Sequence, residues 1–102
     1  MKEITLTEKT QSAHMDFAPV EISEGITIEA SRDIHDDSYV VEGNLKKNGK
    51  DFGRFVLNEN QGRYFVNAPL DDLKRNTKRE IVETVAAIIL NLIPEDTEEE
   101  AG

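Results

Sequence analysis

The chain has 102 residues, no cysteine and a formal net charge of −9 at pH 7. One domain is expected at this length, and the missing cysteine excludes disulfides, thiolate zinc sites and cysteine nucleophiles. No apolar run approaches the roughly 20 residues of a membrane span, and residues 1–5 lack the apolar region of a secretory signal, so we expect a cytoplasmic protein without membrane contact.

The N-terminal third begins without a regular pattern and then becomes strand-like. Residues 1–18 show no sustained hydrophobic period, which predicts a flexible or weakly ordered arm, with a single domain over residues 19–93. Residues 20–30 place apolar side chains on even positions, which is typical of a strand with one buried face. Gly25 indicates a bend or bulge that can split this segment into two strands.

Two hairpins are expected next. Residues 39–46 and 52–58 flank Asn48-Gly49, the strongest short hairpin signal, because a type I′ turn needs positive φ at both central residues. A further strand over residues 63–67 follows the loop 59–62. Pro69 and the acidic pair after it then end the sheet.

Both faces of this predicted sheet are apolar. A two-residue loop pairs Leu45 with Phe52, Val41 with Val56 and Val40 with Leu57, and a four-residue second loop pairs Phe65 with Val56 and Val66 with Phe55. The first face then holds Tyr39, Val41, Leu45, Phe52, Val56 and Phe65, and the second holds Val40, Phe55, Leu57, Tyr64 and Val66. One helix can cover only one face, so the other needs the N-terminal segment, a second copy of the chain or a partner. A slip of one residue in the second loop would redistribute the faces.

The C-terminal segment Thr77–Ile93 is predicted to be an amphipathic helix. Thr77 and Glu80 have the spacing of a capping box, in which each side chain satisfies the other's backbone N–H. The apolar arc of this helix spans about 200°, although a surface helix needs a stripe of roughly 100°. Pro94 stops the helix, and the acidic residues 94–102 are expected to be a disordered tail. The sequence therefore predicts an α+β fold, an antiparallel meander of about four strands with one helix packed on it.

A basic cluster at the start of this helix is a candidate anion site. Lys74, Arg75, Lys78 and Arg79 would converge with free backbone N–H groups, which favour anions at a helix N-terminus. The alternative is that these cations are solvated, or neutralised by Asp71, Asp72 and the acidic N-terminal third of the chain. Nucleic acid is an unfavoured partner because no aromatic side chains are interleaved with the bases.

Candidate catalytic and metal groups are weak. Only one grouping in the sequence could bind a metal ion: His35-Asp36-Asp37 together with His14 and Asp16. It lacks the regular spacing of metal ligands on a helix or strand. The neighbouring Asp71 and Asp72 diverge on any regular backbone, and neither a nucleophile elbow nor a phosphate-binding glycine loop is present. We therefore expect no enzyme, no metal and no cofactor.

Charge is distributed unevenly and suggests an alternative function. Residues 1–37 carry nine acids and three bases (net −6), residues 38–93 seven acids and nine bases (net +2), and residues 94–102 five acids and no base (net −5). Acidic ends of this kind can imitate a nucleic-acid backbone, so an acidic inhibitor or adaptor that binds a different protein is one possibility.

The leading hypothesis is a small non-catalytic interaction module that self-associates as a homodimer. Its interface would use the uncovered sheet face or one edge of the helix. The candidate interface residues are Phe55, Leu57, Tyr64, Val66, Ile89, Leu90 and Ile93. An anion-binding sensor or a small enzyme is the third alternative.

Overall fold

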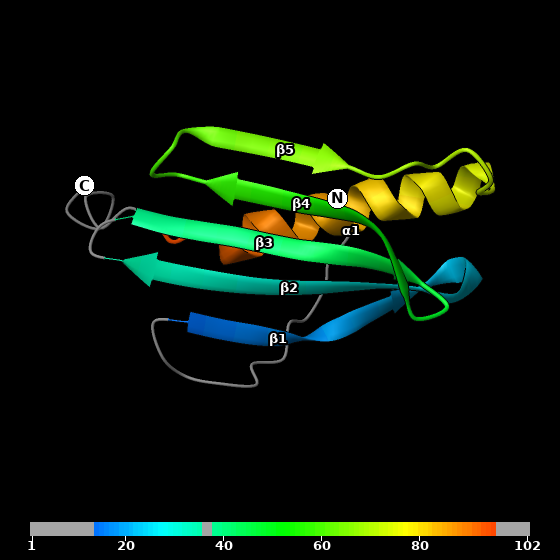
Figure 1. Cartoon of the computed structure of the whole chain (residues 1–102), viewed down its shortest axis with the longest axis horizontal. Coiled ribbons are helices and arrows are strands. Elements are labelled where there is room, and N and C mark those ends of the chain that lie inside the picture. Colours follow the sequence, from blue (N-terminus) through cyan, green and yellow to red (C-terminus); the bar gives the residue numbers. More distant parts are fainter. Residues whose placement is uncertain (1–13, 36–37, 96–102) are drawn as a thin grey trace.

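The computed structural model of the protein describes residues 14–35 and 38–95. Five antiparallel strands follow one another in space as they do in sequence, and one helix packs across one face of the sheet (Figure 1). The elements are β1 (His14–Ile22), the short 3₁₀ turn η1 (Ser23–Gly25), β2 (Ile26–His35), β3 (Ser38–Lys47), β4 (Lys50–Asn58), β5 (Arg63–Asn67) and α1 (Arg75–Leu92). The predicted α+β meander with a C-terminal helix is thus confirmed, with five strands rather than about four.

The extra strand comes from the N-terminal third. The predicted strand at residues 20–30 is split in two by η1, at Gly25, and β1 begins at His14, inside the range expected to be an arm. A register shift between Phe17 and Val20 explains why the sequence pattern fails there. Before the shift the helix-facing side chains are on odd positions, and after it they are on even ones, so no single period runs through β1. Residues 1–13 of the predicted arm and 96–102 of the predicted tail lie outside the described residues.

The β3–β4 hairpin has the predicted turn and a different register. Asn48 (φ 52°) and Gly49 (φ 84°) both lie in the left-handed region, as a type I′ turn requires. A bulge after Leu45 then shifts the pairing by one residue, so that Val41 faces Leu57, not Val56. The second hairpin has the predicted register, with Phe65 opposite Val56.

This shift corrects the prediction of two apolar faces. Because alternate residues share a face, Phe55 and Leu57 join Val41 and Leu45 on the side that α1 covers. The opposite side, called the open face below, is mainly polar over the central strands, with Thr27, Glu29, Ser31, Asp33, Glu42, Asn44 and Lys46. The sheet therefore has the usual form of one buried and one solvated face.

The core is centred on β2, β3 and β4. Ile28, Val41, Leu45 and Phe55 are fully buried and belong to one core cluster with Ile88 of the helix. A side chain at Gly43, opposite Phe55, would collide with the Phe55 ring and with the carbonyl oxygen of Glu29. The glycine therefore lets the ring lie directly over the β3 backbone.

The N-terminus of α1 is capped by another part of the chain. The predicted capping box is wrong, because the helix begins at Arg75 and Thr77 and Glu80 lie inside it. Instead, the Glu24 carboxylate accepts a hydrogen bond from the backbone N–H of Lys74 (3.1 Å), while Glu80 accepts one from the N–H of Ser23 (3.2 Å). The hydrogen bond from the Thr77 hydroxyl, and then that from Lys74, lower the pKa of Glu24.

The C-terminus of α1 is held by β2. The Arg32 guanidinium donates from Nη1 to the carbonyl oxygen of Leu92 (3.1 Å), at the end of the helix that favours a cation. A carboxylate at one end and a guanidinium at the other therefore fix α1 along the β1–β2 hairpin.

Candidate interaction surface

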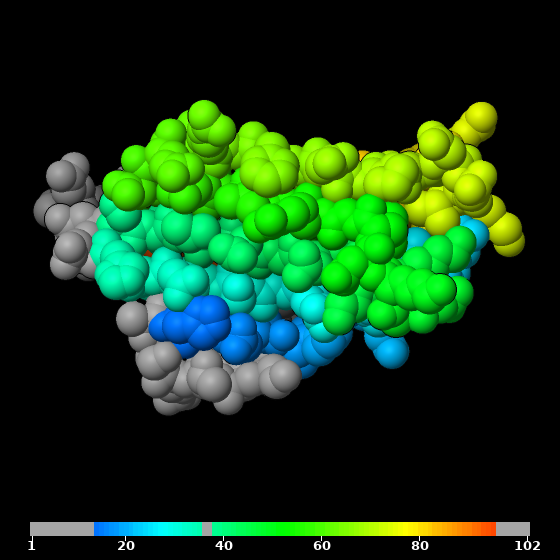
Figure 2. All heavy atoms as spheres, in the orientation of Figure 1, coloured from blue at the N-terminus to red at the C-terminus, as the bar shows by residue number. Residues whose placement is uncertain are grey.

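The most exposed apolar part of the sheet is its last strand. Every residue of β5 is exposed, including three consecutive large apolar side chains: Tyr64 (58%), Phe65 (45%) and Val66 (46%). β5 forms the upper rim of the sheet in the view of Figure 2. Among the described residues it pairs only with β4, which leaves its outer side as a sheet edge.

The position of the helix explains the exposure of β5. Tyr64 and Val66 face the same side as α1, and Phe65 faces the open side. The core residues that share a cluster with α1 come from β1 to β4, and no residue of β5 is buried, so the helix leaves the last strand uncovered. Apolar side chains consequently project from both faces of one exposed strand.

Apart from its shortness, β5 lacks the features that protect natural sheet edges. Such edges usually carry inward-pointing charges, proline or a bulge. The only charged residue of β5 is Arg63 at its start, and its pairing with β4 runs without a register shift. Proline follows only at Pro69, beyond the end of the strand. Within residues 14–35 and 38–95, no strand pairs with the outer side of β5, which therefore offers its N–H and C=O groups to another strand.

The predicted interface residues divide into two groups. Phe55 and Ile89 are buried in the core, so the prediction that they are surface residues is wrong. Leu57 and Ile93 are partly buried against the core, and their role in an interface stays a prediction. The exposed members are Tyr64, Val66 and Leu90. Phe65, which the sequence placed on the other face, joins Tyr64 and Val66 on the exposed strand. Its position in the last strand of a meander was the signal that could have identified it.

The exposed side chains of α1 form a separate feature. Leu90 is 56% exposed, and at 100° per residue it lies nearly opposite the centre of the buried stripe. Val82 is exposed on a different part of the helix surface. Part of the wide apolar arc of the helix is therefore exposed to solvent. Leu90 does not form one surface with Ile93, because Ile93 packs against the core.

The basic cluster surrounds a helix end that already holds a carboxylate. Lys74, Arg75 and Arg79 are exposed and Lys78 is half-buried. Glu24 supplies the anion at this N-terminus, through the N–H of Lys74. Acids of the N-terminal third were one of the predicted neutralising groups. Binding of an external anion stays a prediction.

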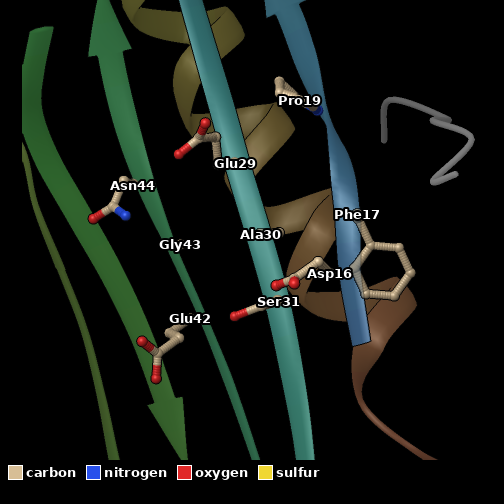
Figure 3. Close-up of a pocket in the computed structure, with 9 residues that line it drawn as sticks. All are labelled: Asp16, Phe17, Pro19, Glu29, Ala30, Ser31, Glu42, Gly43 and Asn44. Atoms are coloured by element: carbon tan, nitrogen blue, oxygen red, sulfur yellow. The ribbon is translucent and has the colours of Figure 1, made fainter. Parts of the chain in front are cut away.

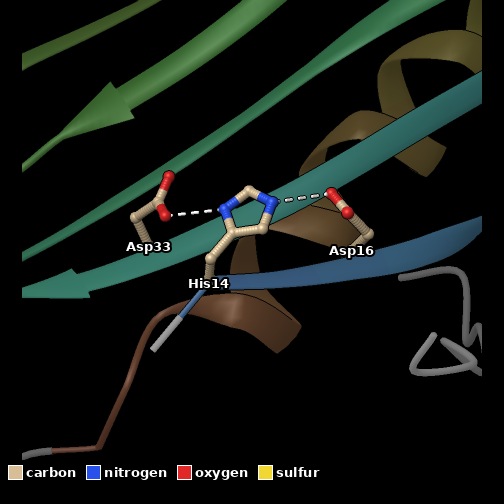
Figure 4. A network of polar contacts seen from close by, with 3 residues as sticks. All are labelled: His14, Asp16 and Asp33. Atoms are coloured by element: carbon tan, nitrogen blue, oxygen red, sulfur yellow. Dashed lines mark hydrogen bonds and ion pairs between the residues drawn. The ribbon is translucent and has the colours of Figure 1, made fainter. Parts of the chain in front are cut away.

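The histidine and its acidic neighbours form a bridge at the start of β1. Figure 4 shows His14 between two carboxylates, with Nδ1 2.6 Å from Asp33 and Nε2 3.0 Å from Asp16. These hydrogen bonds, that to Asp33 first, raise the pKa of His14. His35 lies at the end of β2, while Asp36 and Asp37 fall outside the described residues.

The open face contains a shallow hollow of about 230 Å³ between β1, β2 and β3 (Figure 3). Three carboxylates lie around it, each beside a basic side chain. Glu29 is 3.3 Å from Lys46, Glu42 is 4.0 Å from Arg54, and Asp16 contacts His14. Within residues 14–35 and 38–95, no group of three or more histidine and acidic side chains is arranged to hold a metal ion. The hollow is therefore a paired polar surface without a convergent ligand set.

Comparison with known proteins does not narrow the function. The chain matches no protein-family model, no curated protein and no solved structure. No helix within the described part of the chain is long and apolar enough to cross a membrane.

Proposed function

We propose that the protein is a non-catalytic interaction module that binds an extended polypeptide segment by strand addition to β5. The observation that carries this proposal is the exposure of β5, an edge strand with apolar side chains on both faces and no protecting proline or bulge. Strand addition uses main-chain hydrogen bonds for affinity and alternate side chains for specificity.

The side chains of β5 define the chemistry of the partner strand. Tyr64 and Val66 on the helix side, and Phe65 on the open side, each offer apolar surface at the edge. Cross-strand pairs of aromatic and β-branched side chains contribute roughly 0.2–1 kcal/mol each. A matching partner therefore carries aromatic or β-branched residues on both faces of its strand.

Nucleic-acid mimicry, the alternative from the sequence, receives less support from the described residues. The acids of the open face lie beside cations, as Glu29 does beside Lys46 and Glu42 beside Arg54. A mimic of a phosphate backbone needs an uncompensated row of negative charge. Strand addition at β5 explains a feature that mimicry leaves unexplained.

A site-specific cross-linking experiment tests the proposal in cells. A photoreactive benzophenone amino acid replaces Tyr64 on β5, and in a matched control it replaces Glu21, an exposed residue of β1. We expect covalent adducts from the β5 position and few from the β1 position. Adding Phe65→Lys to the β5 probe should remove the adducts, because a charge at an edge opposes strand pairing.

The control decides the outcome. Equal adducts from both positions, adducts that survive Phe65→Lys, or the absence of any adduct at β5 would contradict the proposal. Mass spectrometry of a specific adduct identifies the bound chain.

A further inference from the structure

We infer that the strand added to β5 is β5 of a second copy of the chain, an inference that rests on the proposed function. The two strands pair antiparallel about a two-fold axis that passes midway between the two Phe65 residues. In this arrangement two five-stranded sheets join into one continuous sheet. Such an interface is isologous, so the same residues must be complementary to themselves.

The sequence of β5 is self-complementary in this register. Phe65 lies opposite the second Phe65, Tyr64 opposite Val66, and Arg63 opposite Asn67. The first pair is aromatic with aromatic and the second aromatic with β-branched, both favourable across strands. The only charge, Arg63, meets a neutral amide, whereas like charges directly opposite each other are destabilising.

Other symmetric registers are poorer. Sliding the pair by two residues to centre it on Tyr64 places Arg63 opposite Phe65 and leaves Val66 and Asn67 without a strand residue to face. Centring on Phe65 is the register that pairs all five residues of Arg63–Asn67.

The distribution of charge also favours joining two copies at β5. Residues 14–35 on the far side of the sheet carry five acids and one base (net −4), while residues 50–67 carry two acids and three bases (net +1). Four strand spacings separate β1 from β5, about 19 Å, which is more than the Debye length of about 8 Å at physiological ionic strength. Pairing at β5 therefore brings together the sides with the least like charge.

The length of β5 limits the strength of this dimer. The five residues of β5 extend over about 17 Å. The strand pair alone therefore buries less accessible surface than the roughly 1,200–2,000 Å² of a stable interface. We expect a Kd in the micromolar range, with exchange between monomer and dimer.

Sedimentation and light scattering of the purified full chain test the inference. The mass is expected to rise from 11.5 kDa toward twice that value between about 1 and about 500 µM. Phe65→Lys and Phe65→Glu should each raise the Kd by about tenfold or more, because identical charges then meet at the two-fold axis. An equimolar mixture of these two proteins should recover dimers, since opposite charges face each other only in the mixed pair.

Leu90→Glu is the matched control, since it places a charge at a similarly exposed apolar residue away from β5. It should leave the Kd unchanged. A monomer at every concentration, a dimer lost with Leu90→Glu and kept with Phe65→Lys, or no recovery in the mixture would overturn the inference. A monomeric protein that still gives specific adducts to another protein at position 64 would overturn the second copy alone and leave strand addition standing. Absence of both dimers and adducts would remove both proposals.

Discussion

The two edges of the sheet are built in opposite ways. β1 carries a register shift between Phe17 and Val20, an exposed proline at Pro19, and the polar residues His14, Asp16 and Glu21. β5 is short and regular, and three of its five residues are large, apolar and exposed. Bulges, proline and charge are the means by which natural sheets prevent edge-to-edge association. One edge of this protein is therefore protected and the other is not.

The two edge strands also differ in how much they contribute to the stability of the fold. β1 contributes Phe17 to the core and is tied to α1 through Arg32, which contacts both Met15 and Leu92. β5 contributes no buried residue. A strand that adds little to the core but keeps its apolar side chains is better explained by binding than by folding.

The largest expected effect comes from comparing two phenylalanines on adjacent strands. Phe55→Ala should lower the free energy of unfolding by about 3–5 kcal/mol, because Phe55 is fully buried over Gly43. Phe65→Ala should change it by less than about 0.5 kcal/mol, because the side chain is exposed. Urea unfolding at low protein concentration measures both. Similar losses for the two variants would contradict the view that β5 serves binding, not the core.

The second prediction removes the protection of β1. The double variant Pro19→Thr, Glu21→Thr restores a donor N–H to the edge and deletes a charge, so β1 should become able to pair. With pairing possible at both edges, association no longer closes at a dimer, and sedimentation should show larger assemblies. Glu29→Thr, which removes an acid from an inner strand, is the control. If the double variant sediments as the unchanged protein does, these two residues are not the protecting features.

The third prediction concerns the link between β2 and the helix. Arg32→Ala removes the hydrogen bond to the Leu92 carbonyl and the contact with the Met15 sulfur, and should lower the unfolding free energy by about 1–2 kcal/mol. Arg54→Ala should have a much smaller effect, because Arg54 is exposed and its ion pair with Glu42 is long, at 4.0 Å. Equal losses, again from urea unfolding, would show that Arg32 contributes no more than a surface charge.

The fold was predictable where a local signal controls the structure. Asn48-Gly49 determines the turn of the β3–β4 hairpin, and the period of apolar residues after Lys74 determines the helix. Two bulges were not predictable, and each reverses the side on which later residues lie. A bulge inserts one unpaired residue into a strand, so the alternation of apolar and polar residues breaks at a point that the sequence does not mark.

The candidate surface was predicted only in part for the same reason. Tyr64 and Val66 are exposed, but they lie on the helix side of the sheet and not on the uncovered face where the sequence placed them. Phe55 was placed on the uncovered face because the register was wrong by one residue. The capping of α1 by Glu24 was also out of reach, since it joins residues 50 positions apart. Long-range contacts of this kind arise from topology and not from local spacing.

The smallest expected effect is a pH dependence at the protected edge. Because the hydrogen bonds to Asp33 and Asp16 raise the pKa of His14 in the folded protein, the folded state binds a proton more tightly than the unfolded state. The resulting stabilisation is complete below the unfolded pKa of about 6.5 and is lost as the pH rises through the folded pKa. The effect is small because all three side chains are about half exposed. An NMR titration of the His14 ring should show a midpoint that falls in Asp33→Asn and falls less in Asp16→Asn, because Asp33 makes the shorter bond. A midpoint that is insensitive to Asp33→Asn would show that the Asp33 carboxylate does not bind the His14 ring, and that this bridge does not hold β1 to β2.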